Sequence, residues 1–335
     1  MEIRRVQKTG GSSYIITLPK EWIKSLNIKK NDPLGMINQS DGTLVITPKM
    51  IEKKQESIKF FKVDDKTNQK YFLRQLVGAY IAGYNSIEIH SKERMPISIR
   101  TSIGKFTQIT IGQEVIEETD MLIIIKDLLK PAEMPFNSTI KRMHLIVKSM
   151  HEDAMNALQT GNKKIAEEIL LRDNDIDRLH WLVARQHNII IQNVGLLEKM
   201  NITIAITSTY FLISKIIERM GDHVVRISQN ILNLMDKNLD KRITEKIKTA
   251  SDQAINTLNK SVGAFFRKDI SASNKNIESM NKLEKLCEEI NEIALKQEGE
   301  IAISIGYIVE SIRRIGEYAE DISETTINYL ILEEK

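Results

Sequence analysis

The sequence is short of the residues that mark secreted, disulfide-bonded or membrane-spanning proteins. Its 335 residues include one cysteine, six prolines and two tryptophans, and aromatic residues make up 5% of the chain. Cys287 cannot form an internal disulfide, and the N-terminus lacks the apolar segment of a signal peptide. The longest stretch without charge, residues 200–214, is too short to cross a bilayer. We therefore expect a cytoplasmic protein that does not span a membrane.

The overall composition is that of a globular protein with two or three domains. Apolar residues make up 41% and charged residues 28% of the chain. The net charge of +3 is unevenly distributed, because residues 1–54 hold ten basic and five acidic side chains. A basic excess confined to one end indicates an anionic partner for that end, commonly nucleic acid.

The first 50 residues have the pattern of a small β-rich unit. Gly10-Gly11 suits a turn that needs positive φ, Pro19 opens a short helix, and Asp41-Gly42 suits a tight hairpin turn. The expected strands are residues 3–7, 13–18, 34–38 and 43–47. Because this unit is too small to bury a core alone, we expect it to dimerise.

Three runs in this region, residues 4–14, 17–22 and 41–46, together resemble a SpoVT-AbrB domain. The resemblance covers residues 1–48 and implies that two chains interleave their hairpins into one swapped β barrel that binds double-stranded DNA. By position, the side chains expected to face DNA are those of Arg4, Arg5, Lys8, Lys20 and Lys24. Such cations neutralise phosphates, and arginine can also bind a guanine edge. The alternative is that they are solvated charges on a dimerisation or partner-binding module.

The next segments have no recognisable chemistry. Residues 49–67 have the composition of a linker, and residues 68–130 alternate helix-like and strand-like patterns, as in a small α/β connector. Neither segment contains a phosphate loop, a GxGxxG motif or a nucleophile elbow. A spacer or a dimer contact is the simplest role for the connector.

After Pro135 the chain is helical to its end. Apolar residues recur at three-and-four spacing from Ile140 to Leu158, and the same pattern returns from Ile243 to Phe265. Each half contains three such helices, which predicts an all-α tandem three-helix bundle over residues 138–235 and 241–332. The fold class expected for the whole chain is therefore multidomain α+β.

A short motif occurs once in each half. Residues 217–223 read IERMGDH and residues 312–318 read IRRIGEY, 95 positions further on. In the first copy Glu218 and Asp222 share one helix face, with Cβ atoms about 5 to 6 Å apart. The second copy has Arg313 and Glu317 at these positions. Two neighbouring carboxylates need a compensating cation.

These repeats resemble the PhoU family over residues 138–332. The resemblance implies metal clusters held by Glu/Asp-x-x-x-Asp motifs, one per repeat, and restraint of phosphate uptake through contact with transporter and sensor proteins. Glu218 and Asp222 match the first motif, whereas Glu317 and Asp321 form a literal motif one turn beyond the matching position. The implied cofactor is a divalent or iron-type metal ion.

The residues themselves leave alternatives open at the first motif. Either an oxygen-bound cation or an arginine salt bridge could compensate Glu218 and Asp222. Further acidic residues on the preceding helix are either additional ligands or a solvated face; these are Asp173, Asp175 and Asp177. Two histidine pairs are spaced seven residues apart, which is too far to share one metal without other ligands; these are His144 with His151 and His180 with His187.

We find no nucleophile with a base at catalytic spacing, so no enzymatic activity is expected. Together, the two resemblances imply a DNA-binding homodimer that couples phosphate status to transcription. A phosphate transporter ATPase and a phosphate-sensing protein are candidate partners. The alternative is an adaptor that controls a phosphate transporter by protein contact and uses its basic module for dimerisation.

Overall fold

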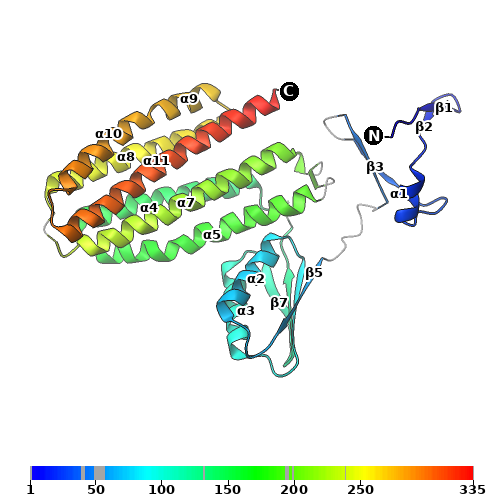
Figure 1. The fold of residues 1–335 in the computed structure, drawn as a ribbon, viewed down its shortest axis with the longest axis horizontal. Coiled ribbons are helices and arrows are strands. Elements are labelled where there is room, and N and C mark those ends of the chain that lie inside the picture. The colour runs from blue at the N-terminus through cyan, green and yellow to red at the C-terminus, as the bar shows by residue number, and fades with distance from the viewer. Residues whose placement is uncertain are drawn as a thin grey trace. The chain divides into compact units, whose positions relative to one another are not determined.

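The computed structural model describes residues 2–38, 42–48, 57–130, 133–192, 196–197, 200–237 and 239–334. The chain divides into two compact units, residues 1–55 and residues 56–335, each of which is described by itself (Figure 1).

The N-terminal unit consists of two antiparallel hairpins and one helix. The first hairpin pairs β1 (Gln7–Thr9) with β2 (Ser13–Ile15), and the second pairs β3 (Gly35–Asn38) with β4 (Leu44–Thr47). Gly10 and Gly11 have φ of +59° and +85°, which confirms the expected turn. Helix α1 (Lys20–Ser25) follows Pro19, as expected. Residues 40 and 41 of the second predicted turn lie outside the described residues.

The hairpins of one chain do not close into a barrel. Among the described strands, β1–β2 and β3–β4 form two separate two-stranded sheets. No described residue of this unit is buried. The swapped barrel expected from the sequence would therefore need a second chain.

The larger unit begins with a four-stranded sheet covered on one face by two helices (Figure 1). The strands are β5 (Ile58–Val63), β6 (Ser86–Ser91), β7 (Gln113–Glu118) and β8 (Leu122–Asp127), and the helices are α2 (Gln69–Ile81) and α3 (Ile97–Ile109). The sheet order is β5-β6-β8-β7, in which only β5 and β6 are parallel. Alternate isoleucines of β6 and β8 pack against Phe72 and Phe106 of the helices. The linker predicted over residues 49–67 is wrong at β5, because this strand turns Phe61 and Val63 toward the core.

The remaining helices form two consecutive groups. The first contains α4 (Phe136–Thr160), α5 (Lys163–Ile191) and α7 (Ile204–Leu234). The second contains α8 (Lys241–Arg267), α9 (Ile270–Glu278), α10 (Met280–Ala294) and α11 (Gly299–Glu333). The sequence predicts three helices in the second half, but the described residues form four, because the helix before α11 is divided at Ser279 into α9 and α10.

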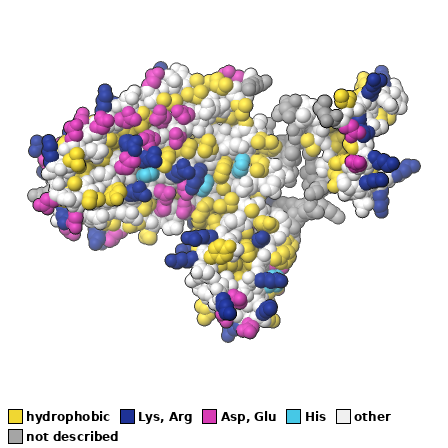
Figure 2. Space-filling model, in the orientation of Figure 1, with side chains coloured by type: hydrophobic (Ala, Val, Ile, Leu, Met, Phe, Trp, Pro, Cys, Tyr) yellow, Lys and Arg dark blue, Asp and Glu magenta, His cyan; other side chains and the backbone are white. Residues whose placement is uncertain are grey.

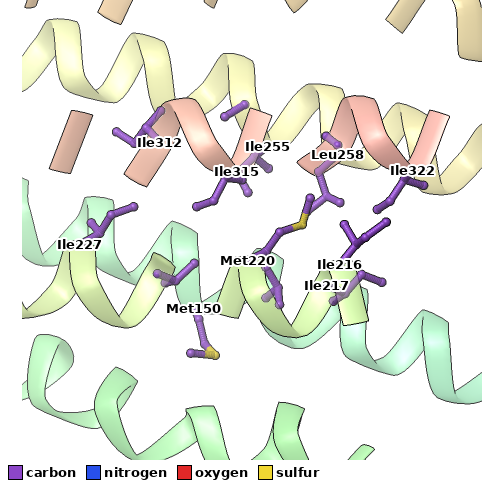
Figure 3. Close-up of a cluster of buried hydrophobic side chains, with 14 of the residues drawn as sticks. Met150, Ile216, Ile217, Met220, Ile227, Ile255, Leu258, Ile312, Ile315 and Ile322 are labelled. Atoms are coloured by element: carbon purple, nitrogen blue, oxygen red, sulfur yellow. The ribbon is translucent and has the colours of Figure 1, made fainter. Parts of the chain in front are cut away.

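Helices α7 and α11 lie at the centre of the bundle and pack against each other. In Figure 3, Ile216, Ile217 and Met220 of α7 face the same cluster as Ile312 and Ile315 of α11. The two helices also meet at matching positions, since His223 and Tyr318 lie 95 residues apart in sequence and their ring centroids are 5.7 Å apart. Within the described residues, no helix combines the length and apolar character needed to cross a membrane.

Candidate functional site

The first motif lies on α7 with a lysine already paired to it. Glu218 is largely buried, with 12% of its side chain exposed, and Lys215 Nζ donates to both carboxylate oxygens at 2.7 Å. Asp222 lies one turn further along α7, and burial and the charge of Glu218 raise its pKa. An ammonium group therefore holds one of the two carboxylates predicted to bind a metal.

Helix α5 adds two more carboxylates. Burial and the charges of Asp222 and Glu218 raise the pKa of Asp173 to about 6. Burial and the charges of Asp173, Glu218 and Asp222 raise the pKa of Asp177 to about 7. We call these four side chains the acidic cluster. Asp175 lies apart from it and pairs with Arg178 at 4.0 Å.

Gly221 allows α5 and α7 to approach closely at the acidic cluster. A Cβ atom on Gly221 would lie 2.6 Å from Ile176 Cδ1 and 3.4 Å from Asp173 Oδ1. The glycine of the motif therefore has a packing role beside its two acidic neighbours.

The donor set of the acidic cluster fits a hard cation. Carboxylate oxygens are the ligands that such ions prefer, and the Lys215 ammonium shows where a positive charge is stabilised. In the described part of the chain, no three metal-binding side chains already converge on one point. Binding would therefore require the carboxylates to turn inward and Lys215 to release Glu218.

In the second motif, arginine side chains form ion pairs with the carboxylates. Arg313 pairs with Glu317 and with Glu310, the latter at 2.8 Å, and Arg314 donates to Glu317 at 2.8 Å. Asp321 lies a turn further on, where burial and the charges of Glu324 and Glu317 raise its pKa. Glu317 thus has two guanidinium partners, which argues against the predicted metal pair of Glu317 and Asp321.

The neighbouring helix also differs between the repeats. Gly316 matches Gly221 in the motif, yet a Cβ there would overlap Leu283 Cδ2 and lie 2.9 Å from Met280 Cε. Leu283 and Met280 therefore take the places of Ile176 and Asp173. The sequence did not reveal this substitution, because α5 matches α9 and α10 only after the break at Ser279 is placed.

The histidines of the two pairs contact residues of other helices, and His180 and His187 both stack on Phe211. Ring nitrogens of His144, His151 and His180 lie 2.8, 2.5 and 3.0 Å from Asn259, Ser251 and Ser214, respectively. His187 stacks on Phe211 at 4.9 Å, and His223 packs against Tyr318. The spacing of seven residues thus serves contacts between helices.

The predicted DNA-facing residues fall into two groups. Arg5, Lys8, Lys20 and Lys24 are exposed. Arg4 is held by its own chain, since its guanidinium donates to Thr17 Oγ1 at 2.9 Å and to the carbonyls of Thr17 and Leu18, and pairs with Glu2. Four cations are therefore available to an anionic partner, whereas Arg4 is bonded to the segment between β2 and α1.

Large apolar side chains are exposed beside these cations. On the segments around β1 and β2, Ile3 is 82%, Val6 63% and Tyr14 72% exposed. Others in the same unit include Ile15, Ile16, Leu26, Met36 and Leu44. So much apolar surface on a unit of this size is typical of a protein–protein interface.

Arg185 is an important residue that the sequence analysis did not single out. It lies on α5, is 3% exposed, and pairs at 2.5 Å with Asp127 at the end of β8. Asn188 on the same helix donates to the carbonyl of Ile81 at 2.9 Å. A lone arginine directly after the apolar run of residues 182–184 was the available signal.

Comparison with known proteins matches both parts of the chain. The PhoU domain model matches residues 140–231 and 247–326, and the model described as antidote-toxin recognition MazE, bacterial antitoxin, matches residues 7–54. The phosphate-specific transport system accessory protein PhoU homolog 1 of Thermotoga maritima is 21% identical over 197 residues, which are 57% of this chain and 83% of that protein.

Two solved structures share the bundle fold. PhoU from Pseudomonas aeruginosa superposes with a TM-score of 0.52 at 17% identity, covering 59% of this chain and 96% of the other. The phosphate transport system regulatory protein PhoU from Streptococcus pneumoniae gives a TM-score of 0.51 at 17% identity, covering 58% and 92%. The fold of the tandem helical repeats, the duplicated motif and a family match over just over half of the sequence lead to one assignment: the chain belongs to the PhoU family.

Proposed function

We propose that this protein is a DNA-binding regulator of phosphate homeostasis that acts in the cytoplasm as a homodimer. The observation that carries the proposal is the combination in one chain of PhoU repeats with a basic MazE/AbrB-like module. Four exposed cations of that module are suited to the phosphates of double-stranded DNA. The helical repeats would convey a signal from a protein partner or an ion, with no catalytic step.

Binding of the full-length protein to its own upstream DNA tests this proposal. Fluorescence anisotropy at 50 and 200 mM salt should show a steep loss of affinity with salt. The Arg5→Ala/Lys8→Ala variant should bind more weakly and have a salt slope smaller by about one unit per lost phosphate contact. The matched control is Arg74→Ala/Lys105→Ala, which removes one exposed arginine and one exposed lysine from α2 and α3. Equal salt slopes in both variants would contradict the assigned DNA face.

A second candidate function is control of a phosphate transporter by protein contact. It is favoured by the relative described as a transport system accessory protein and by the apolar surface of the N-terminal unit, which would then serve dimerisation. Salt-insensitive or absent DNA binding, together with capture of a phosphate transporter ATPase, would support this function instead.

We also propose that the acidic cluster binds a divalent or iron-type metal ion. Glu218 and Asp222 would supply ligands from α7, and Asp173 and Asp177 from α5. Elemental analysis of untreated protein should find metal that the Glu218→Ala variant lacks. Equal, near-zero content in both proteins would favour compensation by Lys215 alone.

A further inference from the structure

We propose that only the first PhoU repeat binds a metal ion. In the second repeat the acidic and basic positions of one ion pair are reversed, so that an arginine stands where the first repeat has a metal-binding glutamate. This inference rests on the metal site proposed above. It adds which of the two repeats can bind the metal and which residues prevent binding in the other.

The exchange is visible at two matching positions. Lys215 and Glu218 pair three residues apart on α7, and 95 positions later Glu310 and Arg313 pair three residues apart on α11. The spacing is the same and the signs are reversed. Asp222 and Glu317 remain acidic, and Arg219 and Arg314 remain basic. The two copies thus differ in which position of this pair is positive.

The reversal changes how firmly the cation is held. Lys215 is joined to one carboxylate, through a flexible side chain that is 40% exposed. Arg313 is joined to Glu310 and Glu317 together, and Arg314 binds the same two carboxylates. A lysine ammonium can swing into solvent, whereas a guanidinium is always charged and its planar fork binds two groups at once. Release of Glu218 is therefore easier than release of Glu317.

The helix that faces the motif also offers fewer carboxylates in the second repeat than in the first. Asp173 and Asp177 face the motif in the first repeat, and the residues 107 positions later are Met280 and Glu284. The thioether of Met280 is a poor ligand for a hard cation. Cys287, at the position of His180, does not restore a ligand for a hard cation, because its side chain is buried and sulfur is a soft ligand.

The summed charge at the two sites follows from these substitutions. The first repeat brings together four carboxylates and one displaceable ammonium, so it retains a surplus of negative charge. At the four matching positions of the second repeat only Glu284 and Glu317 are acidic, and Arg313 stands where Glu218 does. A divalent cation entering the second site would meet a guanidinium at the position of its expected ligand. The donor set there does not fit a metal.

Titration of the chelator-treated, full-length protein with Mn²⁺ tests the inference. Isothermal calorimetry and the Mn²⁺-induced rise in melting temperature should both detect binding in the wild type. Glu218→Gln should weaken that binding at least tenfold and abolish the rise, whereas Glu317→Gln, at the position that matches Asp222, should leave both unchanged. Loss of half of the bound Mn²⁺ in Glu317→Gln would overturn the inference.

A variant that undoes the exchange provides the converse test. Met280→Asp/Glu310→Lys/Arg313→Glu would give the second repeat the donor set of the first, and additional Mn²⁺ should bind. If this variant keeps the wild-type circular dichroism spectrum and melts cooperatively but binds no additional Mn²⁺, the inference is wrong. If it does not fold, the two glutamine variants still decide the question.

The outcomes separate this inference from the proposed metal site itself. A wild type that binds no Mn²⁺ would refute the proposed site in the first repeat. Binding by the triple variant alone would then still show that Arg313, Glu310 and Met280 prevent metal binding in the second repeat. Absence of binding in both proteins would overturn the inference as well.

Discussion

Arg185 joins the α/β part of the larger unit to the helical bundle. Its guanidinium pairs with Asp127, donates to the carbonyl of Tyr84 at 2.9 Å and to that of Tyr80, and lies 4.9 Å from the centroid of the Tyr80 ring. Both charges are almost fully buried, with 3% and 5% of the side chains exposed. Each charge is tolerated in the interior only because the other is present.

Replacing Arg185 with alanine should therefore lower the free energy of unfolding by about 3 to 5 kcal/mol, because Asp127 would remain buried without a counter-ion. Denaturant unfolding followed by circular dichroism measures this loss. The control is Arg172→Ala, which breaks a pair with Asp153 whose arginine side chain is 26% exposed, and it should cost about 1 kcal/mol or less. Comparable losses in the two variants would contradict the role given to Arg185.

His151 gives the bundle a predictable response to acid. The side chain is fully buried, with Nε2 2.5 Å from Ser251 Oγ, and burial lowers its pKa from 6.5 to about 4. Between these two pH values the unfolded chain binds a proton that the folded chain does not, so stability falls as the pH falls through this window. In His151→Gln the free energy of unfolding should depend on pH less steeply, by about 1.4 kcal/mol per pH unit between pH 6 and 5. Unfolding titrations at both pH values measure the slope, and an unchanged slope would refute the prediction.

At the scale of elements, the two central helices depend on glycine where a neighbouring helix crosses closely. Gly221 on α7 faces Ile176, and Gly316 on α11 faces Leu283 and Met280. Gly306 lies on α11 as well, but a Cβ placed there would meet no atom within 4 Å. One helix therefore offers a crowded glycine and an uncrowded one.

This contrast predicts opposite effects of the same substitution on α11. Gly316→Ala should destabilise the protein by about 1 to 3 kcal/mol, because the new methyl group overlaps Leu283. Gly306→Ala should be neutral or stabilise by up to about 1 kcal/mol, since alanine has the higher helix propensity. Thermal unfolding of both variants beside the wild type provides the measurement. Destabilisation by Gly306→Ala would contradict the open space found around this glycine.

The elements that could be predicted from sequence are those whose residue pattern lies within the element itself. The three-and-four spacing from Ile140 to Leu158 matches α4, and the motif at Glu218 lies on α7 as expected. The division at Ser279 could not be predicted, because no glycine or proline marks it in the sequence. Strand β5 was missed because only part of the run 58–63 faces a core.

The acidic cluster was predictable only in part, for a similar reason. Glu218 and Asp222 are four residues apart, so their proximity follows from helix geometry. Asp173 and Asp177 come from another helix, and only the packing of α5 on α7 at Gly221 brings them to the motif. The importance of Lys215 and Met280 depends on which residues of the two repeats match, which requires the register of neighbouring helices.

At the scale of the whole molecule, the two units differ in how their apolar side chains are covered. In the larger unit, side chains of both helical groups share one continuous core. Figure 2 shows Lys, Arg, Asp, Glu and His side chains spread over the visible face of the bundle. The N-terminal unit has no buried residue among those described, and many of its large apolar side chains are exposed. Burial of these side chains against a second chain would supply the missing core.

A charge placed in this apolar surface should therefore dissociate the proposed homodimer. Ile16, which is 46% exposed, is the test position, and Ile16→Glu should yield monomers that also lose affinity for DNA. Sedimentation velocity of the full-length protein reports the oligomeric state. The control is Ile97→Glu on α3, where the isoleucine is 83% exposed, and this variant should remain dimeric. A dimer that survives Ile16→Glu would place the interface elsewhere.

The lone cysteine has a practical consequence for measuring the distance between the two units. Cys287 is 1% exposed, and burial raises the pKa of its thiol to about 12, so thiol-directed reagents should leave it largely unmodified in the folded protein. One cysteine introduced at Lys24 and another at Lys105 could then be labelled without first removing the native residue. Spin labels or fluorophores at these two positions would report the distance between the N-terminal unit and the rest of the chain, with and without metal or DNA.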